Sequence, residues 1–268
     1  IILGRLLDSI HLLRHSNWKT DLSVKFDQIA SSMLSWVNQV SYSDGSTPMV
    51  NDCALDMAPT THTLIEYANI LEVHPLSLPL GECGYRMVRK EAYECFIDIG
   101  DIGPDYIPGH AHSDTFSFEL YRDGEPLIVD TGISTYEKNK IRHFERSTSA
   151  HNTVMIANLD QSEVWASFRV ARRASISDLE EESDYYRSIH DGYEERIGVK
   201  HQREFLFKTR QIIIRDSIIG HINTSAKALF HFSAKLEPIL SGNKCIINAA
   251  TLSFSDGIGR LIPYEQAE

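Results

Sequence analysis

The spacing of the hydrophobic residues changes once along the chain, and this change constrains the fold more than any other feature. Up to about residue 72, apolar residues recur every three to four positions, which is the period of one helix face. Beyond a stretch rich in proline and glycine at residues 72–84, they form short runs rich in β-branched and aromatic side chains. The pattern predicts a helical part followed by a β domain, which we divide into residues 1–76 and 77–268.

The helical part contains three segments with an apolar face, and the β domain contains six runs that are typical of strands. The helical segments are Leu3 to Leu13, Leu22 to Val40, and Leu64 to Leu71. The predicted strand regions are residues 85–100, 115–130, 152–157, 204–218, 228–235 and 243–254. Strands without helices between them predict an antiparallel β-sandwich.

The Asp123–Gly124 pair predicts a hairpin with a two-residue type I′ turn, because both positions must adopt positive φ angles. With a regular register on either side of this turn, Phe118 faces Val129 and Ser117 faces Asp130. Asp130 then lies on the polar face of the hairpin.

Composition limits the possible partners. The 268 residues, 42% of them hydrophobic, suffice for one large core or two modest ones. The net charge of −11 argues against a nucleic-acid or anionic-membrane surface, and no apolar run approaches the roughly 18 residues that a membrane span needs. The four cysteines lack metal-type spacing. The first residue is not methionine, so we expect the chain to be a fragment of a longer protein.

Two histidines and a carboxylate suggest a metal site. His112 and His151, with Asp130, supply two imidazoles and one carboxylate, which is a common zinc arrangement. If residues 103–117 were extended, His112 would lie roughly 17 Å along the strand from Ser117, too far to share a metal with Asp130. Either the two residues do not share one, or the glycines and prolines of this segment fold it back over the hairpin.

Three blocks in the β domain resemble a known family. GHAHSDTFSFELYRDGEPLIVDTG, RHFERSTSAHNTVMI and DQSEVWASFRVARRA follow in the order found in the C-terminal half of the heparinase II/III-like polysaccharide lyases. SYSDGSTPMVNDCALDMAPT resembles the end of the helical domain that precedes it. The resemblance implies an α+β multidomain fold, in which the C-terminal part of an (α/α) toroid is followed by a large antiparallel β-sandwich.

The resemblance also implies a reaction and residues for it. Members cleave uronic-acid polysaccharides by β-elimination in the cleft between the two domains. By motif position, His112, Asp130 and His151 correspond to the ligands of a structural zinc, and His110 corresponds to the histidine of the cleft. Tyr136 corresponds to a tyrosine of some members, and it can act as acid or base if cationic neighbours lower its pKa. The Asn-His pair and the tyrosine that the family places further upstream are not found in this chain.

An acidic substrate needs a local basic patch in a chain that is negative overall. Arg142 and Arg146 are the candidates for binding it, with the alternative that Arg146 ties its loop to neighbouring carboxylates. We therefore expect an anionic polysaccharide as the partner, no nucleic acid and no membrane insertion, and leave a homodimer open. A periplasmic or secreted location is favoured.

Two other functions stay open at the level of the sequence. One is a non-catalytic, metal-stabilised protein that binds glycan or assists polysaccharide assembly. The other is a hydrolase in which the metal activates water. The identity of the polymer is not encoded in any motif, because specificity depends on the shape of the cleft.

Overall fold

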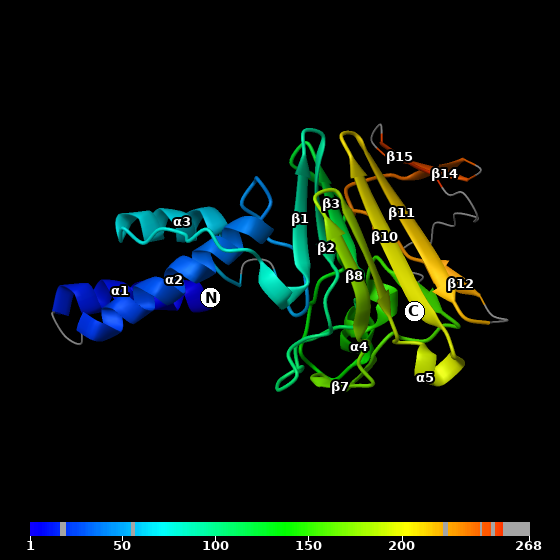
Figure 1. Ribbon diagram of the computed structural model, residues 1–268, viewed down its shortest axis with the longest axis horizontal. Coiled ribbons are helices and arrows are strands. Elements are labelled where there is room, and N and C mark those ends of the chain that lie inside the picture. The colour runs from blue at the N-terminus through cyan, green and yellow to red at the C-terminus, as the bar shows by residue number, and fades with distance from the viewer. Residues whose placement is uncertain (17–19, 55–56, 222–224, 242, 248–249, 254–268) are drawn as a thin grey trace.

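The computed structural model describes residues 1–16, 20–54, 57–221, 225–241, 243–247 and 250–253. Three helices come first, and antiparallel strands interrupted by short helices follow (Figure 1). The helices are α1 (Ile2–Ser16), α2 (Thr20–Val40), α3 (Thr61–Ile70), α4 (Lys140–Arg146) and α5 (Glu194–Ile197), with 3-10 turns η1 (Gly81–Cys83) and η2 (Thr148–Ala150). The first three confirm the predicted helical part.

Helices α1 to α3 pack through one shared apolar cluster, as amphipathic helices must. The face of α1 is the predicted one, with Leu7 and Ile10 fully buried. Thr60 caps α3 by accepting a hydrogen bond from a backbone N–H of its first turn. In α2 the three- to four-residue spacing predicts a face that includes Phe26, Ile29 and Met33, but Leu34 is buried while Ile29 stays 42% exposed.

Within the described residues, the strands form two four-stranded antiparallel sheets and three smaller ones. The first large sheet has the order β1-β2-β3-β4 and the second has the order β11-β10-β9-β8. Their strands are β1 (Tyr85–Lys90), β2 (Tyr93–Asp98), β3 (Phe118–Arg122), β4 (Glu125–Ile128), β8 (Ile176–Glu182), β9 (Tyr185–His190), β10 (Lys200–Lys208) and β11 (Gln211–Ile219). The smaller sheets contain β5 (Val154–Ile156), β6 (Glu163–Trp165), β7 (Arg169–Ala171), β12 (Ala226–Ala228), β13 (Ile239–Ser241), β14 (Lys244–Ile247) and β15 (Ala250–Ser253).

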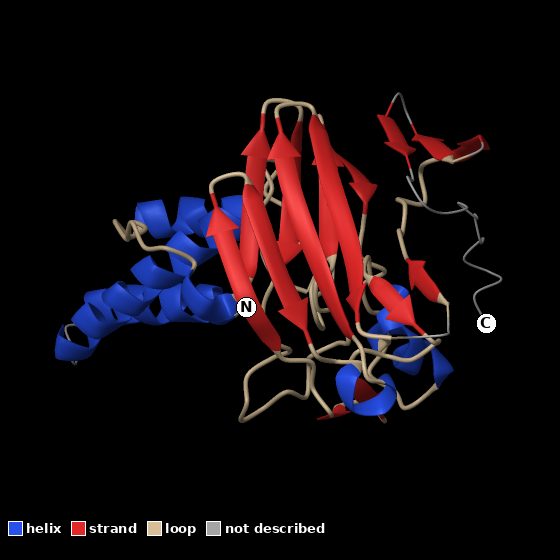
Figure 2. Cartoon of the chain, turned by 45° about the vertical axis from the view of Figure 1, so that its right-hand side comes forward, coloured by secondary structure: helices blue, strands red, loops and turns tan. Residues whose placement is uncertain are grey.

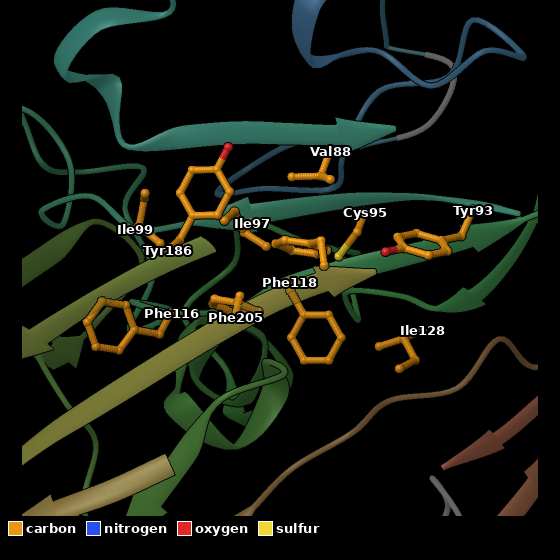
Figure 3. Packing of buried hydrophobic residues seen from close by; sticks show 11 residues of the cluster. Val88, Tyr93, Cys95, Ile97, Ile99, Phe116, Phe118, Ile128, Tyr186 and Phe205 are labelled. Carbon is orange, nitrogen blue, oxygen red and sulfur yellow. The ribbon is translucent and has the colours of Figure 1, made fainter. Parts of the chain in front are cut away.

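One hydrophobic core lies between the two large sheets (Figures 2 and 3). Phe118 from the first sheet meets Phe205 from the second edge to face, with ring centroids 5.9 Å apart. Cys95 and Ile97 of β2 and Tyr186 of β9 belong to the same cluster. Alternation along β10 explains its contribution, since every second residue of this strand is buried.

The hairpin of β3 and β4 confirms the predicted turn but corrects the predicted register. Asp123 and Gly124 both have positive φ angles, +52° and +78°, as a type I′ turn requires. Next to the turn the pairing is the expected one, but a bulge follows, and Leu120 pairs with Ile128. The bulge turns Ile128 toward the main core, and Leu127 packs into a separate cluster with the C-terminal strands. The predicted pairs of Phe118 and Ser117 therefore do not form.

Two other strand predictions were incomplete. Strands β6, β8 and β9 were not predicted, and most of β8 is polar and exposed, so that its sequence lacks an apolar alternation. Residues 228–235 do not form the predicted strand, apart from Ala228 at the end of β12 and a single bridge at Phe232. Within the described ranges, no helix has the length and hydropathy to cross a bilayer.

Polar contacts join the helical part to the first large sheet. Glu119 of β3 is buried and accepts hydrogen bonds from the Tyr42 hydroxyl, 3.1 Å away, and from the Met49 backbone N–H, 2.7 Å away. Burial raises the pKa of Glu119 to about 8, and the nearby Asp130 carboxylate adds to this effect. Nearby, Glu94 of β2 accepts hydrogen bonds from Ser43. Residues 42–52, which follow α2, are thereby held against the sheet.

Candidate active site and metal site

The segment from Gly103 to Ser117 is folded into turns rather than extended, so the distance along an extended strand does not separate His112 from the hairpin. The guanidinium of Arg146 donates to the carbonyl of Ala111, and the Ser113 N–H donates to the carbonyl of Arg146. The hydroxyls of Ser113 and Thr148 lie 2.7 Å apart. The loop that carries both histidines is thus bound to the segment that leads into His151.

These contacts bring three potential metal ligands together. Ligand atoms of His112, Asp114 and His151 all lie within 4.8 Å of one another, and all three residues are buried. The two imidazole rings have centroids 5.3 Å apart. Two imidazoles and a carboxylate suit Zn²⁺ and related cations.

Each imidazole of this group has one nitrogen bound to a carboxylate and one that is free. Nε2 of His112 donates to Asp52 Oδ1 at 3.0 Å, and Nδ1 of His151 donates to Asp130 Oδ2 at 2.6 Å. His112 Nδ1 and His151 Nε2 are buried and have no hydrogen-bond partner among the described residues. A cation would satisfy both nitrogens, in the carboxylate–histidine–metal arrangement that is usual in proteins. The residues present therefore fit a metal.

Asp130 lies on the far side of His151 from the free nitrogen. One of its oxygens accepts from the His151 ring and the other from the Gly132 N–H. In this geometry the carboxylate of the group of three is Asp114, while Asp130 orients His151. Asp130 as a direct ligand stays a prediction.

Burial and pairing determine the charges at the metal site. Burial lowers the pKa of His112 to about 4, despite its contacts with Asp52, so this ring is neutral and can act as a ligand. Burial raises the pKa of Asp114 to about 6. Burial opposes the charged form of His151, but the Asp130 carboxylate outweighs it and holds the pKa of His151 above its usual value.

Asp52 is the centre of the neighbouring polar network. It follows Asn51, whose positive φ of 53° is one that asparagine tolerates, and its side chain is only 5% exposed. Besides His112, it accepts hydrogen bonds from His110 Nδ1 at 2.6 Å and from two nitrogens of Arg142 at 2.5 and 2.8 Å. Burial alone would raise the pKa of Asp52, but these donors hold it well below its usual value, so Asp52 is an anion.

His110 lies at the edge of an open cavity. Its side chain is 63% exposed, and it lines a cavity of about 630 Å³ together with Phe168, Arg169 and residues of its own loop. Because an ionised carboxylate only accepts hydrogen bonds, Nδ1 of His110 carries the proton that is donated to Asp52. The other nitrogen, Nε2, is then left with a lone pair when the ring is neutral.

Tyr136 lies beside His110, but its pKa is not lowered, which was the condition for its role as acid or base. The two rings have centroids 6.1 Å apart, and Tyr136 is 45% exposed. Its contact with the Arg142 guanidinium, 5.1 Å from the ring centre, lowers the pKa. Loss of hydration and the Asp52 carboxylate outweigh this, and the pKa of Tyr136 is raised. This pKa favours a proton donor over a base.

The predicted basic patch of Arg142 and Arg146 is wrong, because both side chains are fully buried. Arg142 donates to Asp52 and to the Ser167 carbonyl. Arg146 ties its loop through the Ala111 carbonyl, not through the carboxylates considered above. Neither guanidinium faces the cavity, and we assign both a structural role in place of the predicted contact with substrate.

Sequence reasoning missed three residues of this region, Asp52, Asp114 and Phe168, and it placed Arg169 on the solvated face of a strand. Asp114 was within reach, because it is the last residue of the His-x-His-x-Asp pattern that starts at His110. Asp52 lies 58 residues before His110 in a polar turn, and its partners follow only from the tertiary structure.

Comparisons with known proteins agree with this fold. The family model for Heparinase II/III-like, C-terminal, matches residues 74–263. No curated protein matches the chain. Among solved structures, heparan sulfate lyase HepC from Pedobacter heparinus aligns with a TM-score of 0.65 and 17% identity, over 91% of this chain and 41% of that one. A heparinase III gene product aligns with a TM-score of 0.62 and 16% identity, over 90% of this chain and 39% of that one.

A third structure, of heparinase III, aligns with a TM-score of 0.55 and 17% identity, over 91% of this chain and 45% of that one. The chain spans about two fifths of the length of these lyases. At this identity the structural likeness shows a shared fold, and the family model shows the relationship. The chain belongs to the heparinase II/III-like family, as the motifs around His110 and His151 indicated.

Proposed function

We propose that the intact protein is a polysaccharide lyase that cleaves a uronic-acid-containing glycan by β-elimination. The observation that carries this proposal is the pair of Asp52 and His110 at the rim of the cavity, in a chain of this family. The C5 proton of a uronate is weakly acidic, so catalysis needs a base whose lone pair is aimed at it. Asp52 supports His110 in that role, since it accepts the Nδ1–H and leaves Nε2 for the substrate.

The elimination then requires two proton transfers. The C5 proton moves to His110 Nε2, the electrons of the C5–H bond form the C4–C5 double bond, and the C4–O4 bond breaks. The departing O4 takes up a proton, and Tyr136 is our candidate donor because its raised pKa keeps it protonated. A cation must also neutralise the carboxylate of the substrate.

A metal at His112, Asp114 and His151 has a structural role in this proposal, and Zn²⁺ is the cation that we propose. When bound, it would cross-link the loop of His110 to the segment before β5. His112 lies two residues from His110, so fixing the first restricts the second. We expect His112→Ala to lower metal content and stability together, whereas His110→Ala spares both and abolishes turnover.

The proposal is tested by incubating the intact protein with heparin, heparan sulfate, hyaluronan and alginate. An unsaturated uronate product gives an increase in ultraviolet absorbance that His110→Ala abolishes. Binding without this increase would favour the non-catalytic glycan-binding alternative. Saturated products that disappear on chelation would favour the metal-dependent hydrolase.

Other features of the whole protein are part of this proposal. We propose that α1 to α3 are the last helices of an (α/α) toroid and that the sheets from residue 77 onward form the family's large β-sandwich. A periplasmic or secreted location suits a polymeric substrate, and cell fractionation tests it. A homodimer is tested by sedimentation.

A further inference from the structure

The turn between β6 and β7 and the first residue of β7 present an aromatic ring and an arginine side chain to the cavity that His110 lines. Phe168 and Arg169 line the same cavity as His110. Phe168 is 43% exposed, so part of its ring is accessible from the cavity that it lines. Its ring lies edge-on to His110, with centroids 5.6 Å apart, and the ring of Tyr136 is 5.3 Å away.

Arg169 differs from Arg172 and Arg173, which follow it, in that those two arginines form ion pairs. Arg172 pairs with Glu163 at 3.0 Å, and Arg173 pairs with Asp105 at 3.2 Å. Arg169 is exposed, and no hydrogen bond or ion pair of its side chain is found in the part of the chain that the structure describes. Its guanidinium is therefore available to an anionic group in the cavity.

Arg142 links this turn to Asp52, the carboxylate that also accepts a hydrogen bond from His110. Arg142 donates to the Ser167 carbonyl from Nε at 3.2 Å and from Nη2 at 3.0 Å, while Asp52 binds its other side. The guanidinium carbon of Arg142 also lies 5.5 Å from the centre of the Phe168 ring. The histidine and the turn are thus fixed relative to each other, as a preorganised binding site requires.

Gly109 brings the two segments into contact. A Cβ atom at this position would lie 3.4 Å from the carbonyl oxygen of Phe168 and 3.6 Å from its Cβ. The loop that carries His110 therefore packs directly against the turn that carries Phe168. A sugar that contacts one of these segments lies within reach of the other.

We propose that Phe168 and Arg169 form a subsite for one acidic sugar of the glycan. The apolar face of the pyranose ring stacks on Phe168, and the anionic oxygens of the sugar pair with Arg169. This subsite supplies the cation that the buried Arg142 and Arg146 do not offer to the cavity. The inference rests on the proposed function for the class of glycan, and it concerns binding, which is measured without turnover.

The test measures binding of unsulfated hyaluronan oligosaccharides to the intact protein by calorimetry. Arg169→Gln is expected to weaken binding by roughly tenfold or more, as the loss of a charge-assisted hydrogen bond implies. Phe168→Ala is expected to weaken it by roughly three- to tenfold. Arg172→Gln is the matched control, since this arginine is paired with Glu163, and it is expected to leave binding unchanged.

Carboxyl-reduced oligosaccharides identify the group that Arg169 binds. The unaltered protein and Arg169→Gln are expected to bind them equally, and a sulfated, carboxyl-reduced glycan that restores the difference would assign sulfate instead of carboxylate. In turnover, Arg169→Gln is expected to raise KM with little change in kcat, because the subsite binds substrate and transition state alike. Thermal unfolding checks that each variant is folded.

The outcomes separate this subsite from the proposed reaction. Unchanged affinity of Arg169→Gln, an equal loss for carboxyl-reduced and native glycans, or no binding by the unaltered protein would each overturn the subsite. Binding that depends on Arg169 without formation of unsaturated product would overturn the lyase proposal and leave the subsite in place. Formation of unsaturated product with an unaltered KM in Arg169→Gln would overturn the subsite and leave the lyase proposal in place.

Discussion

Replacing Asp52 with asparagine removes the charge that neutralises a buried guanidinium. Arg142 is fully buried, and the two oxygens of Asp52, whose side chain is 5% exposed, accept hydrogen bonds from two of its nitrogens. Asparagine has nearly the same shape and keeps one acceptor oxygen. The variant therefore tests the charge with little change in packing.

The expected loss of stability follows from the buried charge of Arg142, which remains when Asp52 is replaced. Removing one partner of a buried ion pair costs about 3–5 kcal/mol, because the other charge is left uncompensated in a medium of low dielectric constant. Since asparagine retains one acceptor, we expect Asp52→Asn to lower the free energy of unfolding by about 3 kcal/mol. A typical domain is stable by about 5–15 kcal/mol, so the variant folds but is clearly weakened.

Urea denaturation at neutral pH measures this loss. The control is Asp27→Asn, which breaks the ion pair of Arg14 and Asp27 on the helices, where both side chains are about one-third exposed and the expected cost is at most about 1 kcal/mol. The double variant Asp52→Asn with Arg142→Met is expected to lose less than the sum of the two single variants. A loss below about 1 kcal/mol for Asp52→Asn, or additive losses in the double variant, would refute this account.

Three further variants test other parts of the structure. Glu119→Gln mimics the protonated acid. The pKa of Glu119 in the folded protein is about 8, above its ordinary value of 4.5. The stability that Glu119 contributes is therefore complete below pH 4.5 and is lost as the pH rises through 8. The variant should remove this decline, which is at most about 1.4 kcal/mol per pH unit, and parallel pH profiles of unfolding would contradict it. Asp114→Asn should lower the metal content, measured by elemental analysis, more than Asp130→Asn does. Asp130 orients His151, so its replacement is expected to weaken metal binding roughly 10- to 100-fold. Equal losses in the two variants would make both residues ligands. Asp216→Asn should lower the free energy of unfolding by about 2–3 kcal/mol in urea, since the buried Arg203 loses its counter-charge although asparagine keeps one acceptor, and a loss under about 1 kcal/mol would contradict this.

The sequence predicted those parts of the fold that depend on short-range patterns. The helices of the first part and the turn at Asp123 follow from periodicity and turn chemistry, which are local properties. The bulge at Leu120 is not a local property, because it depends both on how β3 pairs with β4 and on how the two faces of the hairpin pack. Strand β8 was missed since its exposed, acidic residues carry no apolar pattern, and its pairing with β9 sets its conformation.

The same division holds in the site. His110, His112 and His151 were found because they lie in motifs, and the structure places two of them in the group of three potential ligands. The buried state of Arg142 could not be predicted, since its partners are a carboxylate 90 residues away and the backbone carbonyl of Ser167. The sequence alone does not distinguish a buried arginine from one that faces solvent.

The position of Asp52 also bears on the domain boundary predicted between residues 76 and 77. Asp52 belongs to the helical part, yet it accepts hydrogen bonds from His110, His112 and Arg142, which all belong to the β domain. A β domain without the helical part would keep both histidines and bury Arg142 with no counter-charge from Asp52. The contact between the two parts therefore also orients the ring of His110, through its hydrogen bond to Asp52. The predicted boundary therefore separates residues of one hydrogen-bonded network, and the contact between the two parts belongs to the catalytic arrangement that we propose.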